Sequence, residues 1–447
     1  MDQTEALIIE TIDRHREEIL EFARDIYSHA ELGYKEFQTS GKFVKKMEQL
    51  GLRTEKGFAI TGVKAYLNED KKENASLALL GELDALRIPE HAFANPETNA
   101  AHCCGHHAQM AGVFGAALAL TVPEIAEKLD GQVVFFATPA EEYGEIEFKN
   151  QLREQGKIRY GGGKCELLRI GAFDDIDLCL THHIRPGNEI LVGSGTGNGF
   201  VSKVIRVLGK ASHAAGAPEK GVNALSAASL GLQALGLNRE TFRDEDCVRV
   251  HPIITKGGNL VNVIPDEVVV ETLVRGKTIE AFTDAAKKTD RSFKAGAIAM
   301  GAKVEISTLP GYLPTLAEEA LPELKHAAEI SASGIPVIEA SGHAGGSTDV
   351  GDVQHLMPVY TFNTGGVKGG LHQIDFEVTD EEEAYIVTAK MFALAAYGLL
   401  KEKAQRSREL VDQYEPVFKN SAEYVEFMEQ FDLSLIHISE PTRHSLI

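Results

Sequence analysis

The stretch Ser76-Leu77-Ala78-Leu79-Leu80 is short and apolar, and Gly81 and the acids Glu82 and Asp84 follow it. Three later stretches have the same apolar character, at residues 132–137, 177–181 and 357–362. Continuous apolar runs of this length are typical of strands buried on both faces, and helical stretches such as residues 108–120 separate them. We therefore predict an α/β fold with a mainly parallel sheet covered by helices.

Candidate functional side chains lie shortly after the predicted strands. Asp84 follows the first, Glu141 and Glu142 follow the second, His183 follows the third, and His372 lies beyond the fourth. The carboxyl ends of parallel strands meet at one edge of a sheet, so these side chains are expected to converge there. Paired acids usually form a solvated turn, but here a buried strand delivers them to that edge. Because neighbouring side chains diverge, Glu142 can bind a metal while Glu141 acts as a base.

The local motif Cys104-Gly105-His106 adds a thiol and an imidazole two residues apart. With glycine allowing a tight turn, such a pair can chelate one metal ion or bridge two. Alone the motif is weak evidence, because cysteine is often only a small buried hydrophobe. Three further histidines adjoin candidate ligands and remain competing assignments: His102, His107 and His182.

Residues 197–309 have a different pattern and predict an inserted second domain. Expected strands at 201–208, 247–255, 268–274 and 303–306 alternate with expected helices at 222–237 and 279–300 in the order βαββαβ of a ferredoxin-like sandwich. The first domain then comprises residues 1–196 and 310–400. It closes with a helix over residues 384–400, for which Thr379 and Glu382 suggest a capping box. Residues 401–432 are expected to be peripheral.

Composition excludes several classes of partner. The chain has 45 Lys and Arg against 66 Asp and Glu, a formal charge of −21, which argues against nucleic acid and anionic membranes. The first residues are acidic, unlike a signal peptide, and we expect no membrane-spanning segment. Five cysteines, an odd number, are typical of a reduced cytoplasmic compartment. The expected partner is a small molecule.

Two glycine-rich stretches do not fit nucleotide sites. At Gly161-Gly162-Gly163-Lys164 the phosphate-loop pattern needs glycine at Ile158 and a hydroxyl residue at Cys165. In the run of glycines over residues 193–199, no frame completes the dinucleotide fingerprint.

The last residues are unusual. Residues 433–443 resemble the translation of a sequencing-library adapter, so residues 433–447 are treated as an artefact and left out of fold prediction. His437 is therefore not counted as a ligand.

Taken together and in this order, the motifs resemble those of the M20 metallopeptidase family, and in particular its amidohydrolase branch. That branch and its relatives include aminoacylases, aminobenzoyl-glutamate hydrolases and dipeptidases. The resemblance covers roughly residues 19–400 and rests on segments 29–33, 81–86, 101–106, 139–142, 183–186, 346–352 and 371–372.

The resemblance implies a catalytic domain with two divalent metal ions, either manganese or zinc, with cobalt as a further choice. The implied ligands are Cys104, His106, Glu142, His183 and His372. Glu141 would deprotonate the attacking water and return the proton to the leaving amine, and Asp84 would orient a ligand.

The resemblance also implies that the inserted domain is a lid that forms a homodimer. His213 would reach the active site of the neighbouring subunit and stabilise the oxyanion. Asn262 and Arg275 would lie near the carboxylate of the substrate.

The expected activity is hydrolysis of the amide bond of an N-acyl amino acid or an aminobenzoyl-glutamate-like conjugate. One alternative is a dipeptidase acting on small dipeptides, and another is a non-catalytic, metal-stabilised binding protein. The chain departs from the family in having His107 where Asp or Asn is usual, and in an insertion at residues 145–160. That insertion is expected to cover the cleft and narrow the substrate range.

Overall fold

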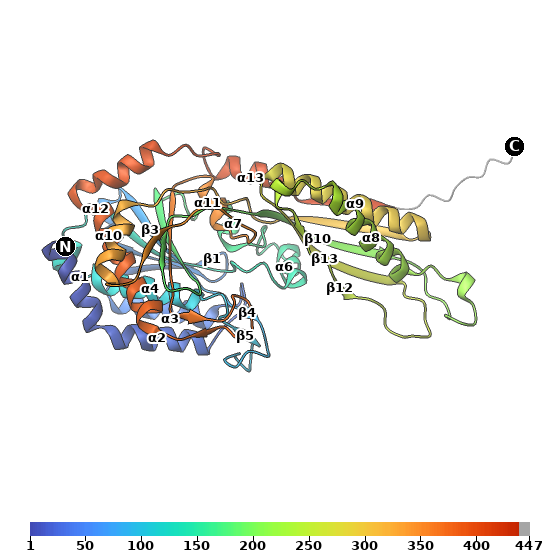
Figure 1. The fold of residues 1–447 in the computed structure, drawn as a ribbon, viewed down its shortest axis with the longest axis horizontal. Coiled ribbons are helices and arrows are strands. Elements are labelled where there is room, and N and C mark those ends of the chain that lie inside the picture. Colours follow the sequence, from blue (N-terminus) through green and yellow to red (C-terminus); the bar gives the residue numbers. More distant parts are fainter. Residues whose placement is uncertain (438–447) are drawn as a thin grey trace. The chain divides into compact units, whose positions relative to one another are not determined.

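The computed structural model describes residues 1–437 and divides into two compact units (Figure 1). Unit 1 comprises Met1–Thr196, Leu316–His343 and Asp349–Val425. Unit 2 comprises Gly197–Thr315, Ala344–Thr348 and the described residues from Glu426 onward. Residues 438–447 of the expected artefact lie outside the described part of the chain.

Unit 1 is built on an eight-stranded sheet in the order β1-β2-β6-β3-β7-β17-β8-β15. The strands are β1 Arg53–Phe58, β2 Gly62–Leu67, β3 Ser76–Glu82, β6 Gln132–Thr138, β7 Leu178–Ile184, β8 Ile190–Val192, β15 Val337–Glu339 and β17 Val359–Thr364. The four predicted strands are β3, β6, β7 and β17, and they are neighbours that pair in parallel. The prediction of an α/β fold with a mainly parallel sheet is confirmed.

The core of unit 1 forms around helix α4, His106–Leu120, in which every residue is buried. Helix α4 packs against β3 and β7, and α1, α2 and α12 pack against α4. The other helices of unit 1 are α1 Gln3–Arg14, α2 Arg16–Ser28, α3 Phe37–Gln49, α5 Pro123–Ala126, α6 Ile146–Glu154, α7 Gly163–Arg169, α10 Pro322–Ser331, α11 Val350–Gln354 and α12 Thr388–Gln413. The lack of a polar face on α4 is explained by this packing, because the helix is covered by both strands and helices.

One helical stretch, Glu382–Gln413, is long and apolar enough to cross a membrane by length and composition, but 89% of its apolar window is buried in the protein. It begins as a π-helix over Glu382–Val387 and continues as α12, which is interrupted by a kink with non-helical backbone angles over residues 401–404. The predicted capping box at its start is wrong. The Asp380 carboxylate accepts from the backbone N–H of Glu382, while the Thr379 hydroxyl donates to the Gly366 carbonyl instead.

Unit 2 is an antiparallel sheet in the order β11-β13-β10-β14-β20, with β12 also paired to β13, and it carries α8 and α9. Its elements are β10 Gly199–Leu208, α8 Ala224–Asn238, β11 Arg249–Val250, β12 Ile253–Lys256, β13 Glu267–Gly276, α9 Ile279–Met300, β14 Lys303–Pro310 and β20 Leu433–His437. Strand β13 alternates between buried and half-buried residues, as expected for a sheet with one covered face. Up to β14, the element order is βαβββαβ, which differs from the βαββαβ order predicted for residues 197–309 because the strand expected at 247–255 is divided into β11 and β12.

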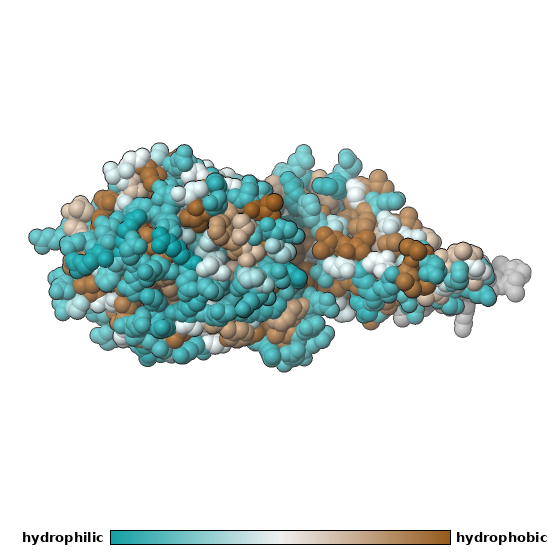
Figure 2. All heavy atoms as spheres, turned by 90° about the horizontal axis from the view of Figure 1, so that it is seen from below, coloured by the Kyte–Doolittle hydropathy of each residue, from teal (hydrophilic) through white to brown (hydrophobic). Residues whose placement is uncertain are grey.

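Smaller elements complete the chain. Three two-stranded ribbons pair β4 Leu86–Arg87 with β5 Ala100–Ala101, β9 Thr196–Gly197 with β16 His343–Ala344, and β18 Val367–Lys368 with β19 Glu377–Val378; helix α13 spans Ser421–Glu429. On the face drawn in Figure 2, most exposed residues are hydrophilic and hydrophobic residues form scattered patches.

Candidate metal centre

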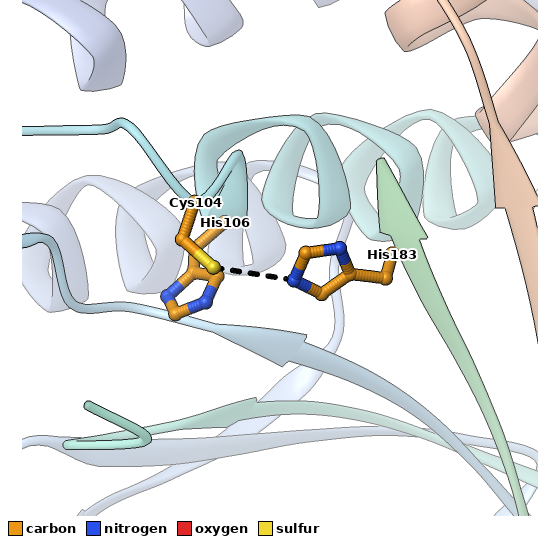
Figure 3. Close-up of side chains that lie close together, drawn as sticks. All are labelled: Cys104, His106 and His183. Carbon is orange, nitrogen blue, oxygen red and sulfur yellow. Dashed lines mark hydrogen bonds between the residues drawn. The ribbon is translucent and has the colours of Figure 1, made fainter. Parts of the chain in front are cut away.

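The glycine of the Cys104-Gly105-His106 motif sets the direction of the two flanking side chains. Gly105 has a φ of 85° and is the residue immediately before α4. A Cβ atom there would lie 2.0 Å from a methyl carbon of Ile184 on β7. Only glycine fits, because both the backbone conformation and the space exclude a side chain. The turn therefore places Cys104 and His106 beside the end of β7, as Figure 3 shows.

Two imidazoles present the same nitrogen to this site. The Nδ1 atom of His106 lies 2.8 Å from the backbone oxygen of Asp84, and the Nδ1 atom of His183 lies 2.7 Å from that of Ile184. With Nδ1–H donating to a carbonyl, each ring leaves the Nε2 lone pair free to bind a metal. Backbone hydrogen bonds thus fix both the orientation and the tautomer expected of ligating histidines.

The thiol of Cys104 lies between two histidines. Its Sγ atom is 3.3 Å from Nε2 of His183, drawn as the dashed line in Figure 3, and 3.3 Å from Nε2 of His372. His372 has a φ of 62°, and its Nε2 atom is also 3.1 Å from Oε1 of Glu142. Two ligands of one tetrahedral zinc lie about 3.5 Å apart when the bonds are about 2.3 and 2.0 Å. The sulfur–nitrogen separations therefore suit ligands that share an ion.

Among the described residues, the predicted ligands form two groups that could each hold a metal ion. One group is Cys104, His106 and His183, and the other is Cys104, Glu142 and His372. The donor atoms within each group lie within 4.8 Å of one another. Cys104 belongs to both, so its sulfur is placed to serve two ions at once. The structure thus brings together all five residues predicted as ligands.

Buried polar atoms without partners provide an independent test of whether the site fits a metal. Nε2 of His106 and Oε1 of Glu142 are both buried without a well-aligned hydrogen bond, although Oε2 of Glu82 lies 3.1 Å from the first atom and Nε2 of His372 lies 3.1 Å from the second. Native proteins leave few such atoms unsatisfied, and bound ions are one accepted explanation. A thiol, imidazoles and carboxylates are also the donor types that divalent transition metals bind. The residues present therefore fit divalent metal ions.

Asp84 connects the ligands to the turn that carries the two glutamates. Its side chain is fully buried, with Oδ1 3.2 Å from Nδ1 of His106. Its Oδ2 atom accepts a hydrogen bond of 2.9 Å from the backbone N–H of Glu142. This position is the one predicted for a residue that orients a ligand.

The turn after β6 is held through its backbone. Ala140 has a φ of 50°, an unfavourable conformation for a residue with a side chain. Its N–H donates to Oε1 of Glu36 at 2.8 Å, and its carbonyl accepts from the N–H of Gly163 at 3.0 Å. The carbonyl of Glu142 accepts from the ammonium of Lys149 at 2.6 Å. These bonds fix the strained turn that carries Glu141 and Glu142.

Glu141 is a buried carboxyl beside the candidate ligands, with Oε2 3.9 Å from Nε2 of His106. Burial raises the pKa of Glu141 well above its ordinary value, and the charges of Glu82 and Glu142 raise it further. A carboxylate that readily takes up a proton in a dry site is suited to general base chemistry.

The three competing histidines lie outside both groups of ligands. His182 is buried on the other face of β7, with Nε2 2.8 Å from the hydroxyl of Thr364 and its ring against Phe362. His107 points to the Tyr385 hydroxyl at 3.1 Å, and His102 packs against His107. None of them belongs to a candidate metal group among the described residues.

Sequence reasoning missed a buried ionic cluster next to this site. The ammonium of Lys164 lies 2.5 Å from Oε1 of Glu82 and 2.6 Å from Oδ1 of Asp349, and all three side chains are buried. Burial alone would raise the pKa of Glu82, but Lys164 and His106 outweigh it and lower that pKa. The available signal was an acid at the end of an otherwise apolar strand.

Three other predicted residues lie in unit 2. His213 is exposed, and its Nδ1 atom accepts from the backbone N–H of Gly216 at 2.9 Å. The next residue, Ala214, donates its N–H to the carbonyl of Asn262 at 2.9 Å, so these two segments are neighbours. Arg275, near the end of β13, donates to the Ser347 hydroxyl at 3.0 Å. Their predicted roles in catalysis and substrate binding stay predictions.

Comparison with known proteins shows the family to which the chain belongs. The family model described as "Peptidase family M20/M25/M40" matches residues 78–397, well over half of the chain. The chain belongs to this family. Its members are peptidases, and the chemistry of this M20 protein is therefore that of a hydrolase.

The individual relatives have low sequence identity to this chain. The chain is 27% identical to the Xaa-Arg dipeptidase of Mus musculus, over 88% of this chain and 85% of that protein. It is 24% identical to N-acetyl-L-cysteine deacetylase of Bacillus subtilis, over 88% and 90%. Three other relatives are matched over 56% to 66% of their own length.

Solved structures share the fold. A dinuclear metal-binding peptidase of the M20 family from Bacillus subtilis superposes with a TM-score of 0.60 at 24% identity. The match covers 87% of this chain and 99% of that one. This likeness supports the architecture of the M20 protein described above.

Proposed function

We propose that this M20 protein is a dinuclear metal-dependent amidohydrolase. Its substrate would be an N-acyl amino acid or an aminobenzoyl-glutamate-like conjugate, cleaved at the amide bond. The observation that carries the proposal is the shared Cys104 sulfur, which belongs to both groups of potential ligands. The buried carboxyl of Glu141 lies against the same cluster.

The two ions would be held by the five residues described above. His106 and His183 would complete one site with Cys104, and Glu142 and His372 would complete the other. Divalent ions bound there supply Lewis acidity, which polarises an amide carbonyl and lowers the pKa of water. Thiolate and imidazole favour zinc, whereas carboxylate also suits manganese, so we propose manganese or zinc, with cobalt as a further choice.

The protein's own groups would move the proton. Glu141 takes the proton from the attacking water and then donates it to the leaving nitrogen, so that the amine departs neutral. Its buried position beside the candidate ligands supports this role, because the carboxyl lies next to the place where the water would be held. The carboxylate of Asp84 holds the His106 ring and the Glu142 backbone in position through these two contacts.

Substrate recognition and assembly extend the proposal. We propose that Arg275 and Asn262 bind the substrate carboxylate, and that His213 of a second copy stabilises the oxyanion, which makes a homodimer the active form. Sizing with inline light scattering, alongside activity of Arg275→Ala and His213→Ala, tests this. A monomer with full activity would contradict it.

A dipeptidase is the second candidate, favoured by the mouse relative that is an Xaa-Arg dipeptidase. The alternative of a non-catalytic binding protein is less well supported, since binding alone gives no reason to retain a buried base at Glu141. All five cysteines are free thiols, which supports a reducing, cytoplasmic compartment as part of the proposal.

The test is hydrolysis of a substrate panel by protein reloaded with manganese or zinc. The panel contains N-acyl amino acids, aminobenzoyl-glutamate, and dipeptides with and without a C-terminal arginine. Chelator-sensitive cleavage of an acyl substrate supports the amidohydrolase, and preference for a dipeptide supports the second candidate. No cleavage by a protein that holds two ions would overturn both.

A further inference from the structure

The buried cluster of Lys164, Glu82 and Asp349 is not used by the chemistry proposed above. It lies in unit 1 and joins three segments: the end of β3, the start of α7, and the residue before α11. Its formal charge is −1, from one ammonium and two carboxylates. A buried lysine is costly unless paired, so both carboxylates are needed to hold this cation in the core.

Lys164 is held in place by its own backbone and by the glycines before it. Its N–H donates to Oδ2 of Asp349 at 2.8 Å, while its ammonium binds Oδ1 of the same residue. A Cβ atom at Gly163 would lie 1.6 Å from the carbonyl oxygen of Pro139. Glycine at this position therefore allows the backbone segments of Gly163 and Pro139 to lie in contact. The glycine-rich stretch, which fits no nucleotide, therefore works as a rigid support for one lysine.

The other oxygen of Glu82 faces the metal centre. Oε2 lies 3.1 Å from Nε2 of His106, the nitrogen predicted to bind an ion, and accepts from Nε2 of Gln109 at 2.8 Å. Glu82, His106 and Glu141 form a third group of donor atoms close enough to hold a metal ion. By position alone, Glu82 is therefore a candidate for a sixth ligand.

The contact with Lys164 indicates whether Glu82 is a metal ligand or only a partner of Lys164. A fixed ammonium at 2.5 Å already neutralises the carboxylate, and its positive charge opposes a second cation on the same group. We propose that Lys164 is a positioning residue that compensates Glu82 and keeps it out of the metal coordination shell. The ions are then confined to Cys104, His106, Glu142, His183 and His372. This inference rests on the metal centre of the proposed function.

The test follows Co²⁺ bound to the full-length protein, by calorimetry and by visible absorption, which responds to the number and type of ligands. Lys164→Met should tighten Co²⁺ binding by about tenfold or more and change the absorption, because the freed carboxylate joins the ion. The double variant Lys164→Met/Glu82→Gln restores the cluster charge of −1 and should return both readouts to wild type. Lys164→Arg should resemble wild type.

Two further variants separate this role from simple support of the fold. Asp349→Asn weakens the cluster without freeing Glu82, so it should lower thermal stability and leave the Co²⁺ spectrum unchanged. Glu82→Gln alone should also keep the wild-type spectrum, because Glu82 is not a ligand in the proposal. This variant tests the proposal even if Lys164→Met does not fold. A changed spectrum in Glu82→Gln, or weaker binding in folded Lys164→Met, would overturn the inference. Wild-type protein that takes up no Co²⁺ would overturn the metal centre itself.

Discussion

The carboxylate of Asp84 accepts a hydrogen bond of 2.9 Å from the backbone N–H of Glu142, although the two residues follow different strands of the sheet. The carbonyl of Asp84 also lies 2.8 Å from Nδ1 of His106. One buried residue thus aligns a ligand from α4 with the turn that carries the proposed base.

Replacing Asp84 with alanine should weaken the metal centre without removing a ligand. Loss of a group that orients ligands costs about 10–100-fold in metal affinity or activity. We expect Asp84→Ala to lower both metal affinity and kcat, measured by calorimetry with Zn²⁺ or Mn²⁺ and by turnover. Unchanged affinity would show that the His106 and Glu142 positions do not depend on this side chain.

Cys104 should matter to both ions, because its sulfur belongs to both candidate groups. Cys104→Ala is expected to reduce bound metal from two ions to none or a weakly held one, whereas His183→Ala and His372→Ala should each lose one ion. Elemental analysis after dialysis measures this. The neighbouring thiol variant Cys103→Ala is the control and should retain two ions. Loss of the same single ion in all three ligand variants would contradict a shared sulfur.

Gly163→Ala should destabilise unit 1 more than most single substitutions. The added methyl group would meet the Pro139 carbonyl at 1.6 Å, which forces the turn before Glu141 to move. We expect a loss of at least about 2 kcal/mol in the free energy of unfolding, together with lower activity. Gly144→Ala is a matched control, since nothing lies within 4 Å of its added carbon. Equal stability of the two variants in urea denaturation would contradict the close approach.

Glu318 should make stability depend on pH. Burial raises the pKa of Glu318 to about 8, against hydrogen bonds from Thr361 and Gln354 that lower it. Between its unfolded pKa, about 4.3, and about 8, the folded state holds a proton that the unfolded state lacks, so stability falls as pH rises. The advantage of wild type over Glu318→Gln should decline across this window by on the order of 4 kcal/mol.

Chemical denaturation at about pH 5 and pH 8 measures this difference. The exposed neighbour Glu319 provides the control, because Glu319→Gln should follow the wild-type curve. A constant difference between wild type and Glu318→Gln would mean that this carboxyl is ionised in the folded protein throughout.

The central sheet could be predicted because its strands are apolar on both faces. The edge strand β1, Arg53–Phe58, could not, since its mostly exposed, polar residues lack that pattern. His183 was expected after a strand, but it lies within β7, because pairing with β17 continues as far as Ile184. Residues 433–437 were left out of fold prediction, yet they pair with β14, whose open edge accepts an added strand. Whether that segment is adapter-derived stays a prediction.

The sequence predicted the candidate ligands of the site but not the contacts that support them. The residue types and their order along the chain predicted five metal ligands, and the structure brings all five together. Contacts made by the backbone leave little trace in a sequence, and so the bond from Lys149 to the Glu142 carbonyl was missed. The same holds for Lys164. Its glycine-rich context did not fit a phosphate loop, and nothing in the sequence indicated its partners, the distant Glu82 and Asp349.

The most direct test compares the two adjacent glutamates. Metal content and turnover are measured for Glu141→Gln and Glu142→Gln, with the exposed Glu147→Gln as control. Glu141→Gln should keep two ions and lose several orders of magnitude in kcat, whereas Glu142→Gln should lose one ion as well as activity. Near wild-type turnover in Glu141→Gln with both ions bound would contradict the assignment of Glu141 as the base.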